Sequence, residues 1–113
     1  MSPDQFRKLA LALPESTESE HMNHPDFRIR KKVFATIGPD GEWGMVKLTP
    51  AQQAAWMERE PKVFEPSPGA WGERGYTKVI LAKAKKESVR RALVEAWYGV
   101  APKTLAADFE DEL

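Results

Sequence analysis

The sequence predicts an α+β fold, in which an antiparallel sheet of about five short strands packs against three helices. Two capping-box signatures, Ser2-Pro3-Asp4-Gln5 and Thr49-Pro50-Ala51-Gln52, indicate helix starts. Short runs in which apolar and polar residues alternate, separated by turn residues, indicate half-buried antiparallel strands. A third helical stripe lies near the C-terminus. Because the turns are short, the strands are expected to form an antiparallel meander.

The composition is that of an ordinary globular protein of single-domain size, with 113 residues of which 42% are apolar and 30% charged. We expect one domain over residues 1–105, followed by an acidic, frayed tail over residues 106–113. Lys and Arg total 17, as do Asp and Glu, so local clusters must define any electrostatic partner. No apolar run approaches the roughly 20 residues of a membrane span, and no signal-peptide pattern opens the chain. We therefore expect a cytoplasmic monomer without membrane contact.

The first helix is expected to begin at Pro3, with Ser2 as its N-cap, and to end at Leu13 because Pro14 follows. Residues 15–23 are polar and have no clear period. They fit either an exposed loop or an edge strand with charged side chains.

A three-stranded meander is expected after the turn signal His24-Pro25-Asp26. Its first two strands are predicted near Phe27–Arg30 and Val33–Ile37, the first with a basic outer face. A turn at 38–41 (GPDG) leads into the returning strand Trp43–Leu48.

The second half of the chain contains two helices and one more strand. A helix is expected over Pro50–Arg59, stopped by Pro61, and another over Lys86–Val100. Between them, residues 64–75 are rich in Pro and Gly and predict a shaped surface loop. This loop delivers the chain into the last strand, Tyr76–Leu81, whose residues alternate in character.

Few residues suggest a chemistry. The chain has no Cys, which excludes thiolate nucleophiles and Cys-based zinc sites. Its two histidines, His21 and His24, lie near Glu18, Glu20 and Asp26, a set that could form a metal site or an acid/base pair. All of them lie in one short stretch, whereas a metal site usually needs three ligands of defined geometry. We interpret them as turn and surface residues, and expect no metal and no cofactor. Because no nucleophile, base and orienting group occur together, we expect no enzymatic activity.

Two basic clusters are candidates for phosphate contacts. One lies on the predicted first hairpin. The other surrounds the start of the last helix, where cations oppose the helix dipole unless an anion binds there. Such residues supply most non-specific affinity for nucleic acid, although charged faces also protect edge strands from aggregation. The candidate nucleic-acid contacts are Arg28, Arg30, Lys31, Lys32, Arg74, Lys78, Lys85 and Lys86.

Two aromatic residues of the Pro66–Tyr76 loop are further candidates. Trp71 lies in the middle of the Pro/Gly segment, and Tyr76 lies where the strand begins. Trp71 either covers the sheet or is exposed for stacking on a base or a partner.

A set of short motifs spans nearly the whole chain. They are HPDFRIR at 24–30, KVFA at 32–35, VKL at 46–48, FEP at 64–66, Gly72, GYTKV at 75–79, AW at 96–97 and APK at 101–103. With these motifs the chain resembles the MmcQ/YjbR-like family of small bacterial proteins over roughly residues 6–103. Lys31 stands where relatives often have Gly, and Tyr76 where many have Trp.

The resemblance implies an α+β fold related to the frataxin-like CyaY shape. Family members are commonly labelled DNA-binding, by analogy with a double-wing β motif, so the first hypothesis is a non-enzymatic DNA-binding module that uses a basic sheet face. The alternative is a small-molecule or protein-interaction module that uses the Pro66–Tyr76 loop. The frataxin relation would imply iron only with an acidic ridge on the first helix. There Asp4 stands beside Arg7 and Lys8, so we expect no iron binding.

Overall fold

Six strands form one antiparallel sheet in the computed structural model, which describes residues 1–112. Their order across the sheet is β1-β2-β3-β4-β6-β5, so β6 pairs with β4, and β5 lies at an edge. The α+β class is therefore confirmed. The strands are β1 (Thr17–His21), β2 (His24–Ile29), β3 (Lys32–Ile37), β4 (Trp43–Lys47), β5 (Phe64–Pro66) and β6 (Tyr76–Ile80).

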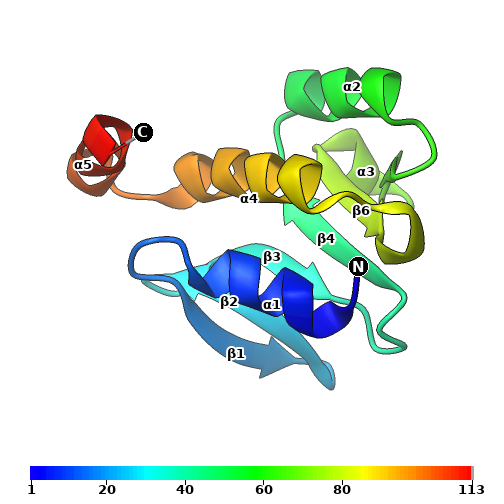
Figure 1. The fold of residues 1–113 in the computed structure, drawn as a ribbon, viewed down its shortest axis with the longest axis horizontal. Coiled ribbons are helices and arrows are strands. Elements are labelled where there is room, and N and C mark those ends of the chain that lie inside the picture. Colours follow the sequence, from blue (N-terminus) through cyan, green and yellow to red (C-terminus); the bar gives the residue numbers. More distant parts are fainter. Residues whose placement is uncertain (113) are drawn as a thin grey trace.

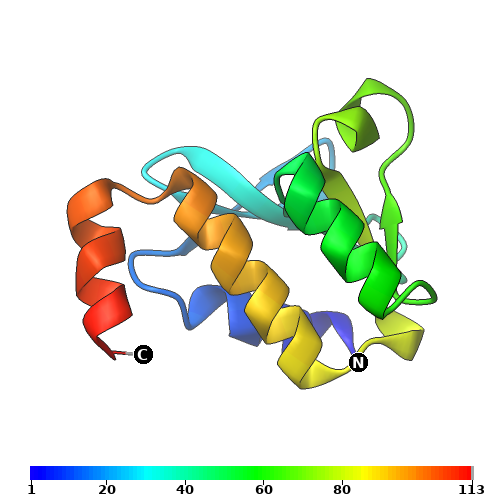
Figure 2. The same cartoon turned by 90° about the horizontal axis from the view of Figure 1, so that it is seen from above.

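The longer helices gather on one face of this sheet. The helices α1 and α4 contact each other and lie over β3 and β4, while α2 lies beside β5 and β6 (Figures 1 and 2). No helix in the described part of the chain is long and apolar enough to cross a membrane. The helices are α1 (Pro3–Leu11), α2 (Pro50–Arg59), α3 (Ala70–Glu73), α4 (Lys86–Val100) and α5 (Lys103–Glu112), with a 3₁₀ turn at Leu81–Lys83.

Both predicted capping boxes are present. The Ser2 hydroxyl accepts a hydrogen bond from the backbone N–H of Gln5, and the Gln5 side chain accepts one from the backbone N–H of Ser2. Thr49 and Gln52 form the same reciprocal pair at the start of α2. The first helix ends at Leu11 and not at Leu13 as predicted. Because a residue before proline is disfavoured in helical geometry, the chain leaves the helix early and Leu13 packs into the core.

The core lies between the helices and the inner face of the sheet. On the strand side it contains Phe27, Ile29, Val46 and Val79, all fully buried. On the helix side, Trp97 of α4 is also fully buried, and its indole Nε1 donates a hydrogen bond to the carbonyl of Pro14. The predicted alternation along β6 is therefore confirmed, with Thr77 and Val79 inward and Tyr76, Lys78 and Ile80 on the other face.

Residues 15–23 contain an edge strand. In β1, four of the five residues are exposed, so the strand has no apolar face and no alternation to read. It pairs with β2 along its whole length. Charged side chains on an exposed edge discourage pairing with other chains.

Two further segments contain more regular structure than the sequence indicated. The segment 64–75 is not only a loop, because it contains β5 and the short helix α3. The frayed tail expected over residues 106–113 is helical as far as Glu112, and residue 113 lies outside the described residues. The ring of Phe109 packs 5.0 Å from that of Trp97 and 5.8 Å from that of Tyr98, measured between ring centroids. This aromatic contact holds α5 against the end of α4.

Gly75, which precedes β6, gives the first testable prediction. Its φ is 104°, and a Cβ there would lie 2.1 Å from the Leu48 carbonyl oxygen. Gly75→Ala is expected to lower the free energy of unfolding by about 2 kcal/mol through backbone strain and this clash. Gly99→Ala is the control, because a Cβ at that position of α4 meets nothing within 4 Å. Because alanine favours the helix more than glycine does, Gly99→Ala should raise the free energy of unfolding by up to about 1 kcal/mol. Equal stability of the two variants in urea unfolding would contradict the prediction.

Candidate ligand-binding site on the uncovered sheet face

The outer face of the sheet is hollowed into a cavity of about 640 Å³. The helices α1, α2 and α4 gather on the inner face and do not cover the outer face of the central strands (Figures 1 and 2). The segment that follows β5 borders this cavity, to which it contributes Ser67, Pro68 and Trp71.

A row of cross-strand neighbours crosses this outer face. The Cα partners run from Asp26 on β2 to Thr36 on β3, then to Met45 on β4 and Lys78 on β6. Thr36, Met45 and Lys78 line the cavity, whereas Asp26 is fully buried. The buried carboxylate of Asp26 and the ammonium group of Lys78 therefore lie at opposite ends of this row, with the uncharged side chains of Thr36 and Met45 between them.

A tight hairpin turn brings the two histidines together. His21 ends β1 and His24 begins β2, and their Cα atoms are partners in the sheet. The two residues between them, Met22 and Asn23, both have left-handed backbone, with φ of 50° and 67°. Positive φ at both central residues is the geometry of the two-residue hairpin that suits strand twist. The ring centroids of the histidines lie 4.4 Å apart, and both rings line the cavity.

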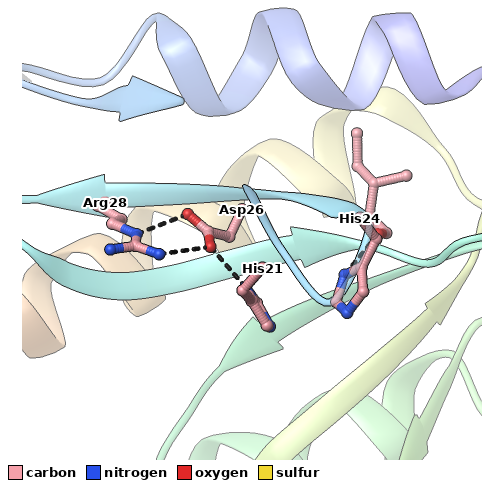
Figure 3. A network of polar contacts seen from close by, with 5 residues as sticks. His21, His24, Asp26 and Arg28 are labelled. Carbon is pink, nitrogen blue, oxygen red and sulfur yellow. Dashed lines mark hydrogen bonds and ion pairs between the residues drawn. The ribbon is translucent and has the colours of Figure 1, made fainter. Parts of the chain in front are cut away.

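Asp26 accepts hydrogen bonds from two side chains on this face, those of Arg28 and His21 (Figure 3). Arg28 donates from Nε to Oδ1 at 2.7 Å and from Nη2 to Oδ2 at 2.9 Å. The Nδ1 atom of His21 lies 2.5 Å from Oδ2. The hydrogen bond from Arg28 lowers the pKa of the Asp26 carboxyl below 3.8, against the opposing effect of burial. Asp26 is therefore an ionised acceptor at neutral pH.

His24 is also held through its Nδ1 atom. This atom lies 3.1 Å from the backbone carbonyl oxygen of Ile37, at the end of β3 (Figure 3). The two histidines are thus fixed by different partners, one by a side-chain carboxylate and the other by a backbone carbonyl.

Aromatic rings form the other part of the cavity wall. Trp43, Trp71 and Tyr76 all line it. Trp71 is 56% exposed and meets Tyr76 edge to face, with ring centroids 5.0 Å apart. The Lys78 ammonium lies over the Trp43 ring, 4.9 Å from its centroid. The Arg74 guanidinium lies over Trp71 at 5.6 Å, although Arg74 does not line the cavity.

The predicted nucleic-acid contacts are only partly brought together. Arg28 and Lys78 line the cavity, with the predicted aromatic residues Trp71 and Tyr76. Arg30 lies outside it and pairs with Glu15 at 3.2 Å.

The two basic clusters lie at opposite ends of the molecule. Lys31 and Lys32 are exposed at the turn between β2 and β3. Lys85 is the N-cap of α4, and Lys86 is its first residue. The β2–β3 turn and the start of α4 are far apart in both views (Figures 1 and 2). A single ligand of the cavity would therefore not contact both clusters.

Sequence reasoning noted that His21 and His24 lie near Asp26 but interpreted the histidines as turn and surface residues and not as a site. It placed His21 in a polar stretch without period, and both His24 and Asp26 in a turn signal. One signal was available, because Asp26 and Arg28 are two residues apart in a segment with strand alternation and so share a face. The pairing of His21 with His24 depends on the hairpin turn at Met22 and Asn23.

Comparison with known proteins gives a family and a fold. Residues 11–98 match the family model YjbR, a range that includes the entire cavity lining. A crystal structure of a Deinococcus radiodurans protein with a DUF419 domain is similar, with a TM-score of 0.75 and 17% sequence identity. The match covers 98% of this chain and 86% of that chain, and at this identity it shows the fold alone. The search of curated proteins gives no match.

The lowered pKa of Asp26 predicts a pH-dependent loss of stability. Because the folded-state pKa lies below the unfolded value of 3.8, the carboxylate stabilises the fold above that pH. This contribution is lost as pH falls through the folded-state pKa. Asp26→Asn should therefore lower the free energy of unfolding by about 1–3 kcal/mol at pH 7, since buried hydrogen bonds to a charge are lost.

Urea unfolding between about pH 3 and pH 7 measures this effect, because the difference from the wild type should shrink towards the acidic end. Glu20→Gln, at an exposed position of β1, is the control and should change stability by no more than about 0.5 kcal/mol. A difference between wild type and Asp26→Asn that stays constant with pH would contradict the assignment.

Proposed function

The chain belongs to the YjbR family, and from that premise we propose that it is a binding module whose cavity takes a small anionic ligand with a planar aromatic group. The observation that carries this proposal is the combination of aromatic and cationic side chains in one cavity of about 640 Å³. This volume lies within the range of about 300–1,000 Å³ that is typical of small-molecule sites.

The aromatic lining supports recognition of a flat ligand. A tryptophan ring exposed beside two other aromatic residues offers a stacking surface, which suits a base or another conjugated ring. The contact between Trp71 and Tyr76 also has a purely structural explanation, since it packs α3 against β6. Trp71 nevertheless stays 56% exposed, although Arg74 lies over its ring, so part of the residue remains accessible for contact.

The charges around the cavity support recognition of an anion. No Asp or Glu is among the described residues that line it, whereas Arg28 and Lys78 are. Arg28 is matched by Asp26, so Lys78 supplies the charge available to a ligand. Its Nζ atom lies 3.9 Å from the half-exposed carboxylate of Glu65. A surface pair of this kind contributes only about 0–1 kcal/mol, so an anion can compete for the ammonium group.

Calorimetric titration with adenosine monophosphate as a probe tests this proposal. We expect saturable binding of the nucleotide. Adenosine should bind more weakly because it lacks the anionic phosphate, and inorganic phosphate because it lacks the aromatic ring. Trp71→Ala should weaken nucleotide binding about tenfold, since one stacked base contributes about 1–3 kcal/mol.

Lys78→Ala should also weaken the binding of the nucleotide but not that of adenosine. Lys85→Ala, at the distant start of α4, is the matched control and should leave both affinities unchanged. If all three probes fail to bind, or if Lys85→Ala has the same effect as Lys78→Ala, the proposal is wrong.

DNA is the second candidate ligand, and the shape of the β2–β3 hairpin favours it. Arg30 and Lys31 both have left-handed backbone, with φ of 47° and 76°, which gives a tight two-residue turn without glycine. Lys31 and Lys32 are exposed at this tip. A two-stranded ribbon with a basic tip is able to enter a groove, and its lysines would contact phosphates.

A salt titration with labelled duplex DNA tests this second candidate. If about four phosphates are contacted, the logarithm of the association constant should fall with the logarithm of salt with a slope near −3.6. The double change Lys31→Ala and Lys32→Ala should reduce the slope by about 1.8, because two phosphate contacts are lost. Lys85→Ala with Lys86→Ala is the matched control. The absence of binding even at low salt would eliminate DNA as a ligand.

A further inference from the structure

His21 and His24 form a pair of imidazoles whose orientation suggests a metal site. They face each other across the β1–β2 hairpin, with ring centroids 4.4 Å apart and ring planes 59° apart. Both rings line the cavity, and the His21 side chain is 40% exposed. The pair is therefore accessible to a solute.

The hydrogen-bond partners determine which nitrogen of each ring carries the proton. The Ile37 carbonyl oxygen only accepts hydrogen bonds, so the Nδ1 atom of His24 donates to it. The two oxygens of the Asp26 carboxylate both accept from the Arg28 guanidinium, which can only donate, so the Nδ1 atom of His21 likewise donates to Asp26. Each neutral ring then has a free lone pair on Nε2.

The two Nε2 atoms are placed on the same side. In Figure 3 the far edges of both rings point the same way, His21 away from Asp26 and His24 away from the carbonyl that holds it. Two imidazoles can bind one metal ion through Nε2, with each nitrogen about 2.1 Å from the metal and a nitrogen–metal–nitrogen angle of about 90°. Their ring centres are then roughly 4.5 Å apart. The observed separation of 4.4 Å is close to this value.

We propose that His21 and His24 bind one divalent transition-metal ion of the class that prefers imidazole, such as Cu²⁺, Ni²⁺ or Zn²⁺. Both Nε2 atoms are ligands. Metal-ligating histidines usually donate their other ring N–H to a carboxylate or a backbone carbonyl, which fixes the ring and makes it a better ligand. Asp26 and the Ile37 carbonyl supply one such acceptor each.

The site has two protein ligands and is open towards the cavity. No group of three or more His, Cys, Asp or Glu side chains able to hold a metal occurs among the described residues. The remaining coordination positions are therefore left to water or to a ligand in the cavity. The positive charge of Arg28 lies nearby, but its ion pair with the Asp26 carboxylate offsets the repulsion between Arg28 and a bound cation. This inference does not depend on the proposed aromatic ligand.

Calorimetry and electron paramagnetic resonance with Cu²⁺ on the full chain test the inference. Cu²⁺ is the first probe, because it binds nitrogen sites most tightly in this series. One equivalent should bind, with a hyperfine pattern from two imidazole nitrogens. His21→Asn and His24→Asn each keep an amide N–H near the position of Nδ1 but remove Nε2. Each should weaken Cu²⁺ binding at least about tenfold while leaving the fold intact.

Three further measurements decide between a metal site and a purely structural pair. Glu20→Gln, a neighbouring exposed carboxylate on β1, is the control and should leave Cu²⁺ affinity unchanged. Asp26→Asn should weaken binding about 10–100-fold, as loss of an orienting group does. In the metal-free protein, two-bond proton–nitrogen spectra should show the proton on Nδ1 of both neutral rings. Wild-type Cu²⁺ affinity in both histidine variants, or a proton on either Nε2, would overturn the proposal.

Discussion

The carboxylate of Asp26 is the interaction on which the uncovered sheet face depends. It lies in the middle of a strand, fully buried, and a charge in that position requires donors on both sides. Arg28 supplies two hydrogen bonds and holds the carboxyl ionised, which leaves Oδ2 able to accept from His21 as well. One buried charge therefore keeps a guanidinium on the outer face and fixes an imidazole at the cavity rim.

The second constraint is the backbone of the two hairpin turns. Met22 with Asn23, and Arg30 with Lys31, all have positive φ without any glycine, a conformation that costs non-glycine residues free energy. The first turn places His21 opposite His24, and the second places two lysines at an exposed tip. Pairing of β1 and β3 with β2 holds both turns in this conformation.

Much of the fold was predictable from the sequence, because its signals are local. The bounds of α2 follow from a capping box and a proline stop, and α4 follows from an apolar stripe, so the signals lie within the helices or directly beside them. The helix α3 was missed because it is only four residues long in a Pro/Gly segment, and α5 because its Phe109 gains its partner only in the folded chain. The histidine pair was not recognised as one site because β1 is exposed on both faces and has no period.

Stability alone does not account for the arrangement around Asp26. Replacing a buried ion pair by apolar residues of similar volume is often neutral or stabilising, so a Val at position 26, together with an apolar residue in place of Arg28, would cover this part of the sheet equally well. Such a replacement would not hold His21, whose ring has no other hydrogen-bond acceptor among the described residues. The buried pair is therefore better explained by the orientation it imposes than by the energy it contributes. The candidate site therefore lies at the histidine end of the cavity, where the fold maintains a charge it does not need for its core.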